Sequence, residues 1–142
     1  SGSGVRQTTT ARLTPDAGSV TAFGSFVWPA AGRITQSYSF YHKAIDIANG
    51  SGGPILAADS GVVTQAGWLD GFGYGNRIII DHGNGNQTLY AHLSAIQVRA
   101  GQRINRGDVV GQMGSTGRST GTHLHFEIRQ GGVLLNPLSS LR

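Results

Sequence analysis

A β-hairpin signal in the middle of the chain restricts its fold more than any other feature. Residues 77–81 form an apolar, β-branched run, residues 82–85 (His-Gly-Asn-Gly) contain an Asn-Gly pair, and residues 87–92 have the composition of a returning strand. An Asn-Gly pair between two such runs is a strong predictor of an antiparallel hairpin. An antiparallel sheet is therefore expected at the centre of the fold.

The rest of the chain favours strands and turns over helices. Its 142 residues include 23 glycines but a single glutamate and a single lysine, and both of these residue types favour helices. Short apolar runs at 54–58 and 62–68, and closely spaced glycines between 98 and 114, are typical of a compact barrel or sandwich. We predict an all-β fold of mostly antiparallel sheets, with a sandwich- or barrel-like core, long loops that form a groove, and little helix.

The first residues differ in composition from the remainder. Residues 1–24 are rich in Ser, Thr, Gly and Ala without a period, and they begin with Ser-Gly-Ser-Gly. We predict a tag remnant and flexible linker over 1–24 and one domain over 25–142. The chain has no cysteine, which excludes disulfides, thiolate zinc sites and a cysteine nucleophile. No apolar run is long enough to span a membrane.

The charge pattern limits the partners. The net charge is +4, and arginine supplies all but one of the 11 basic residues, which favours carboxylate or phosphate groups on a partner. The arginines are scattered and form no basic stripe with interleaved aromatic residues, so no nucleic-acid partner is expected. We expect a monomer.

Two histidines near the C-terminus point to one face of a predicted strand. His123 and His125 flank Leu124, and alternate strand residues lie on the same face, about 7 Å apart at about 3.3 Å per residue. This spacing suits a metal ligand beside a catalytic group. It equally suits an exposed polar face that happens to contain two histidines.

His42 and Asp46 are a second pair of candidate ligands. On a straight strand their Cα atoms would be about 13 Å apart, so they can share an ion only if the chain bends between them. One aspartate and two histidines would give three protein ligands and a fourth position for water. That is the pattern of a catalytic zinc site, and the lack of a carboxylate cluster argues against Ca²⁺ or Mg²⁺.

Three motifs, in this order, resemble the lysostaphin/LytM-type zinc endopeptidases of bacterial cell walls: His42-x-x-x-Asp46, Tyr90-Ala-His92-Leu93 and His123-Leu-His125. The resemblance extends over residues 26–138 through a series of glycines and turn residues. It implies that His42, Asp46 and His125 bind one Zn²⁺, and that His92 and His123 flank a water on the metal. Either imidazole could be the general base, with the other one stabilising the oxyanion or passing a proton to the leaving amine.

Other polar and aromatic residues receive structural interpretations. His82 is expected in the hairpin turn with a hydrogen bond to the backbone, and Tyr74 and Tyr90 are expected in the core or in cross-strand pairs rather than along the groove. Glu127 follows His125 by two residues and could support the metal site, but we predict a charge on the strand surface.

Some features leave the substrate class open. Ala44 stands where the family usually has glycine, and Tyr-Ser-Phe-Tyr at 38–41 replaces the usual approach to the first ligand. The resemblance implies cleavage of peptide cross-links or bridges of peptidoglycan, outside the cytoplasm and after removal of a targeting segment. The candidate substrates are pentaglycine bridges, stem-peptide cross-links and glycine-rich peptides that are not part of the cell wall. A pro-segment or regulatory partner could cover the groove.

Three other functional classes were considered. The Gly-x-Ser-x-Gly match at 117–121 leads into a strand rather than a helix, which argues against a serine hydrolase. A biotinyl or lipoyl carrier needs a modifiable lysine at a hairpin tip, whereas Lys43 adjoins His42. A non-catalytic family member that binds the cell wall or regulates a hydrolase is the remaining alternative, but such members typically lose ligands that this chain keeps.

Overall fold

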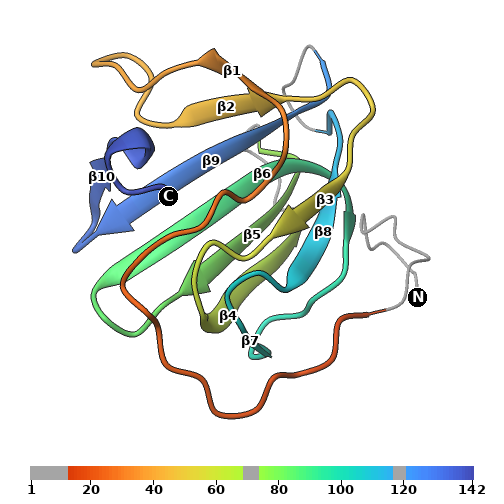
Figure 1. The fold of residues 1–142 in the computed structure, drawn as a ribbon. Helices are drawn as coiled ribbons and strands as arrows, with labels where there is room; N and C mark the ends of the chain where they lie inside the picture. Colours follow the sequence, from red (N-terminus) through yellow and green to blue (C-terminus); the bar gives the residue numbers. More distant parts are fainter. Residues whose placement is uncertain (1–12, 69–73, 117–120) are drawn as a thin grey trace.

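The fold is almost entirely antiparallel β-structure, as predicted. The computed structural model describes residues 13–68, 74–116 and 121–142 (Figure 1). The tag remnant predicted at the N-terminus and most of the Gly-x-Ser-x-Gly match lie outside the described residues. The elements are β1 (Arg33–Gln36), β2 (Ile45–Ala48), β3 (Pro54–Leu56), β4 (Gly61–Trp68), β5 (Asn76–Asp81), β6 (Asn86–Ile96), β7 (Arg103–Ile104), β8 (Val109–Met113), β9 (His123–Gln130), β10 (Val133–Leu135) and the 3₁₀ helix η1 (Pro137–Ser139).

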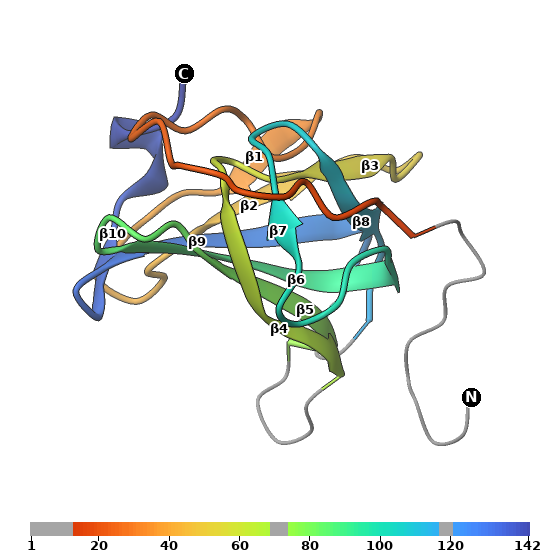
Figure 2. The same cartoon turned by 90° about the horizontal axis from the view of Figure 1, so that it is seen from below.

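The strands form one branched sheet with the order β1-β2-β9-β6-β5-β4-β7. β10 pairs with β9, and β3 pairs with β8. The long strands β6 and β9 cross the middle of the molecule in both views (Figures 1 and 2). β9 pairs with the first half of β6, and β8 pairs with its second half, so β6 is the strand at which the sheet branches.

The predicted hairpin is confirmed. β5 and β6 are antiparallel, with Ile78 opposite Tyr90 and Asp81 opposite Gln87, and the amide of His82 donates to the Asn86 carbonyl at 3.0 Å. Among the described residues, the largest fully buried side chains come from six strands: Tyr90, Phe126, Ile45, Ile47, Ile55, Ile78, Ile80, Leu89, Leu93, Ile96, Ile104 and Leu124.

His82 and Tyr90 belong to a buried polar network within this core. One nitrogen of His82 lies 2.7 Å from the Ser60 carbonyl oxygen, and the other lies 2.9 Å from the hydroxyl of Thr88. That hydroxyl contacts the Tyr90 hydroxyl at 2.7 Å, which accepts a hydrogen bond from the Ala58 amide at 2.9 Å. The structural interpretations of His82 and Tyr90 are therefore confirmed.

Residues 13–24 lie along the domain without forming a strand. The Thr14 amide donates to the Gln97 carbonyl at 2.8 Å, and Asp16 pairs with Arg103 at 2.8 Å. Farther along, the amides of Phe23 and Gly24 both donate to the carboxylate of Asp59, each at 2.9 Å. In the described part of the predicted linker, several backbone amides are thus hydrogen-bonded to the domain.

Gly111 is required by the close approach of β6 and β8. A Cβ atom at Gly111 would lie 2.5 Å from the Ala95 carbonyl oxygen of β6, whereas a Cβ at Gly50 would meet nothing within 4 Å. We expect Gly111→Ala to lower the free energy of unfolding by about 1–3 kcal/mol, because the strands must separate. Gly50→Ala is the matched control. Equal urea midpoints for the two variants would contradict this reading of the β6–β8 contact.

Within the described residues, no helix is long and apolar enough to cross a membrane.

Candidate metal centre

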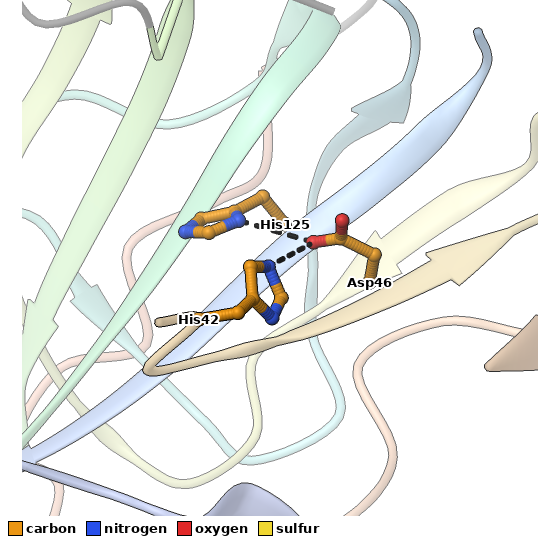
Figure 3. Close-up of side chains that lie close together, drawn as sticks. All are labelled: His42, Asp46 and His125. Atoms are coloured by element: carbon orange, nitrogen blue, oxygen red, sulfur yellow. Dashed lines mark hydrogen bonds and ion pairs between the residues drawn. The ribbon is translucent and has the colours of Figure 1, made fainter. Parts of the chain in front are cut away.

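Three predicted ligands meet on one face of the sheet. Asp46 on β2 lies directly opposite His125 on β9, and its Oδ1 atom is 3.1 Å from His125 Nδ1 (Figure 3). His42 Nε2 lies 3.4 Å from the same oxygen. One ligand atom from each of the three residues lies within 4.8 Å of the other two. Imidazole nitrogens and a carboxylate oxygen are donors that Zn²⁺ accepts, so this set fits a zinc ion.

A bend in the chain brings His42 close to Asp46, which a straight strand could not do. His42 and Ser39 exchange backbone hydrogen bonds of 2.8 and 3.1 Å, which closes a turn just before β2. The chain bends again at Ala44 before β2 begins at Ile45. The i, i+4 pair of His42 and Asp46 is therefore brought together as the sequence analysis required.

His92 lies at an irregularity in β6. Asn76 pairs with Leu93 and Ile78 pairs with Tyr90, so one residue of β5 faces two residues of β6, which is the pattern of a β-bulge. His92 has a φ of 68°, and among the described residues no other non-glycine residue has a positive φ. Such a conformation is costly and needs support from its surroundings. The support includes a hydrogen bond from the His92 amide to the Tyr74 carbonyl at 2.8 Å.

The bulge directs the His92 ring toward the other histidines. Its centroid lies 5.0 Å from that of His123 and 5.9 Å from that of His125. His92 Nδ1 lies 2.7 Å from the Thr116 carbonyl oxygen, so Nδ1 is the donor and Nε2 is left to accept a proton. The Thr116 hydroxyl donates to the Leu93 carbonyl at 2.6 Å, which holds Thr116 against β6.

His123 begins β9 at the rim of the same cluster. Its Nδ1 lies 3.0 Å from the Gly121 carbonyl oxygen, and its Nε2 lies 3.8 Å from Asp46 Oδ2. A hollow opens beside it, lined by Thr35, Gln36, Asp46, Ala48, Gly121, Thr122 and His123. Of the three candidate ligands, Asp46 lines this hollow.

Glu127 lies at the candidate metal centre and not on the strand surface. The prediction of a charge on the strand surface is wrong: the residue is only 4% exposed, and its Oε2 atom lies 2.9 Å from His125 Nε2. Tyr74 donates to that same oxygen at 3.0 Å, and Arg129 donates to Oε1 at 2.7 and 3.1 Å. Tyr74 is partly buried against the small apolar cluster of Ile79, Leu89 and Ala91, and its ring also lies 5.7 Å from that of His125.

From the sequence, a supporting role for Glu127 was considered but a surface charge was favoured, and Tyr74 was placed in the core or in a cross-strand pair, although one signal favoured the role of Glu127. Glu127 follows His123 and His125 at the two-residue spacing of a strand, so it had to share their face. Whether that face was covered depended on the segment around Tyr74, which is 53 residues away in the sequence.

The protonation of the imidazoles follows from their surroundings. Burial lowers the pKa of His92, which therefore stays neutral at neutral pH. Burial also lowers the pKa of His125, but the hydrogen bonds that its ring donates to Asp46 and Glu127 outweigh burial and raise the pKa to about 9 in the metal-free protein. The same hydrogen bonds to His125 hold the pKa values of Asp46 and Glu127 below their usual range despite burial.

Zinc binding should therefore depend on pH. A metal ion at His125 Nδ1 must displace the proton that the raised pKa keeps there, so each bound ion releases that proton below about pH 9. We expect the apparent zinc affinity to increase about tenfold per pH unit between pH 7 and 9 and then to level off. Titration at each pH in zinc buffers of known free-metal concentration measures this affinity. An affinity that is constant from pH 7 to 9 would contradict this protonation state.

Comparisons with known proteins agree with the geometry. The family model described as Peptidase family M23 matches residues 40–137. The chain is 49% identical over 98 residues to a Neisseria meningitidis protein named DD-carboxypeptidase/endopeptidase Mpg, covering 69% of the chain and 22% of that protein. It is 40% identical over 124 residues to the Escherichia coli murein hydrolase activator NlpD, covering 85% and 32%.

Solved structures give the same result. Lysostaphin from Staphylococcus simulans superposes with a TM-score of 0.71 at 28% identity, over 83% of this chain and 53% of that one. A zinc-containing peptidase from Vibrio cholerae superposes with a TM-score of 0.73 at 28% identity, over 79% and 39%. The chain spans only about a fifth to two-fifths of the length of the curated relatives that it matches.

Proposed function

The chain belongs to peptidase family M23, and on that premise we propose that it is a zinc-dependent endopeptidase that hydrolyses peptide cross-links or bridges of bacterial peptidoglycan. The observation that supports this most strongly is the completeness of the site. Three potential ligand atoms lie within 4.8 Å of one another, and the imidazoles of His92 and His123 lie beside them. A binding module would need neither the ligands nor the two additional imidazoles.

We assign the metal to His42 Nε2, Asp46 and His125 Nδ1. A zinc ion held there would lower the pKa of a bound water and polarise the carbonyl of a peptide. Both histidine nitrogens face Asp46, at 3.4 and 3.1 Å from its Oδ1 atom. The ligands need only small shifts to close around an ion, because β2 and β9 are already hydrogen-bonded neighbours.

His92 is proposed as the proton acceptor. Its Nδ1–H is used by the Thr116 carbonyl, its Nε2 can accept, and burial keeps the ring neutral at neutral pH. Water adds to the peptide carbonyl carbon as His92 takes its proton. The C–N bond then breaks, and the same proton goes to the amine nitrogen that leaves, so the protein neither gains nor loses a proton over the cycle.

His123 is proposed to stabilise the carbonyl oxygen while negative charge develops there. Its position at the start of β9 beside the hollow supports this assignment. The glutamate base that H-E-x-x-H proteases carry on a helix has no counterpart here, because the chain's single glutamate is buried against His125 and Arg129.

Peptidoglycan lies outside the cytoplasm, so we propose an extracytoplasmic site of action. The similarity to a murein hydrolase activator, over 85% of the chain, favours one second candidate: a domain that stimulates another hydrolase without cleaving the wall itself. The intact ligand set argues for catalysis by this chain.

Zinc stoichiometry and wall digestion on the same sample separate the two proposals. A catalytic domain should bind about one zinc ion per chain and release soluble peptides from purified peptidoglycan with no other protein present. Removal of zinc by a chelator should stop the release, and added zinc should restore it. An activator would release peptides only when a second hydrolase is added.

A further inference from the structure

We propose that Glu127 is a positioning residue that determines which nitrogen His125 presents to the metal. The inference rests on the proposed function, because it concerns the same site. Glu127 contacts the ligand His125 directly and, through Tyr74, the backbone that carries His92.

His125 is oriented differently from the other three imidazoles of the site. His42, His92 and His123 each direct Nδ1 to a backbone carbonyl oxygen, at 3.2, 2.7 and 3.0 Å. They therefore present Nε2 to the cluster. His125 presents Nδ1 to Asp46, and its Nε2 faces Glu127.

The position of His125 in the sheet explains this difference. The other three lie at a turn, a bulge and a strand end, where carbonyl groups of Ser37, Thr116 and Gly121 are available. His125 lies within β9, paired with Asp46 of β2 on one side and with Ala91 of β6 on the other. The backbone there is used by the two ladders, so the acceptor for a ring nitrogen must come from a side chain.

Glu127 is itself held in place on both oxygens. Arg129 donates two hydrogen bonds to Oε1, and Tyr74 donates one to Oε2, the atom that faces His125. At 4% exposure the carboxylate cannot turn into water without breaking these bonds. An acceptor fixed in this way leaves His125 one favourable ring orientation, with the proton on Nε2 and Nδ1 directed to the metal.

Tyr74 extends the effect to the proposed proton acceptor. Its hydroxyl binds Glu127, and its carbonyl accepts the amide of His92, the residue with the left-handed backbone. Glu127 therefore connects one metal ligand to the strained residue on β6 through a single intervening side chain. Loss of Glu127 should disturb both.

Glu127→Ala and Glu127→Gln test the inference, with Asp16→Asn as control. Asp16 is also a carboxylate paired with an arginine, at 2.8 Å from Arg103, but it is exposed and far in sequence from every histidine of the site. We expect Glu127→Ala to weaken zinc binding about 10- to 100-fold, Glu127→Gln to weaken it less because its amide oxygen can still accept, and Asp16→Asn to leave it unchanged.

A second measurement separates positioning from a general loss of structure. In the zinc-loaded parent, the Nε2 proton of His125 should exchange slowly with water and give a ¹H–¹⁵N correlation of a protonated ring nitrogen. Glu127→Ala should lose this signal, Glu127→Gln should keep it, and the backbone amide spectrum should stay folded in both. Equal zinc affinity in the parent and Glu127→Ala, or a retained signal in Glu127→Ala, would overturn the inference. A parent that binds no zinc would instead overturn the proposed function.

Discussion

His125→Ala should lose both zinc and peptidase activity. Among the described residues, His125 makes the shortest contact with Asp46 in the ligand cluster, and alanine removes the nitrogen that closes the three-ligand set. Two remaining ligands leave more than one coordination position to water and hold the ion weakly. We expect metal content near background after dialysis and a loss of kcat/KM of about 10³-fold or more, since metal catalysis contributes several kcal/mol.

The same change should not unfold the protein. His125 is only partly buried, and removing its ring from the metal-free protein leaves the Asp46 carboxylate beside His42 and the Glu127 carboxylate paired with Arg129. His82→Asn is the matched control, because His82 is a buried histidine outside the cluster whose ring joins Ser60 and Thr88. That variant should be less stable yet still bind zinc. Zinc retained at parental stoichiometry in His125→Ala would contradict the ligand assignment.

His92→Ala and His123→Ala should separate metal binding from catalysis. Neither ring belongs to the three-residue ligand group, so both variants should retain most of their zinc. Each should lower kcat/KM by about 10²- to 10⁴-fold, the usual contribution of a positioned acid–base group. The two losses should not add in the double variant, because the residues act on the same reacting atoms.

The pH profiles distinguish the two roles. If His92 accepts the proton, its removal should abolish the acid limb of the kcat/KM profile, which reports protonation of the free base. Removal of His123 should lower the whole profile and leave that limb in place. Identical behaviour of all three variants, His92→Ala, His123→Ala and His125→Ala, would show that the division into ligands and proton-transfer residues is wrong.

The sequence predicted those parts of the site that depend on local patterns. The hairpin followed from an Asn-Gly turn between two β-branched runs, and β5 and β6 formed there. Strand alternation placed His123 and His125 on one face, and the structure has them there, beside Asp46. The bend between His42 and Asp46 was recognised as a requirement, but nothing in the local sequence specified it.

The parts that the sequence did not predict depend on pairing between distant segments. The bulge that turns His92 toward the cluster arises where the register between β5 and β6 shifts. On the other edge of β6, the pairing changes there from β9 to β8. Glu127 became a buried partner of His125 because Tyr74 and Arg129 cover it. The two-residue period of a strand shows which side chains share a face, but it does not show which segment packs over that face and buries it.

Digestion of purified peptidoglycan in ¹⁸O-labelled water, with zinc measured on the same sample, tests zinc-dependent peptide cleavage most directly. Two types of peptidoglycan with different cross-links serve as substrates, and the zinc-loaded chain alone should cleave one of them. Its products should have one new amino group and one new carboxyl group that carries a single ¹⁸O atom. His123→Ala, with its zinc retained, should release far less. Zinc-loaded parent that leaves both walls intact, or that releases only products cut in the sugar strands, would contradict the proposal.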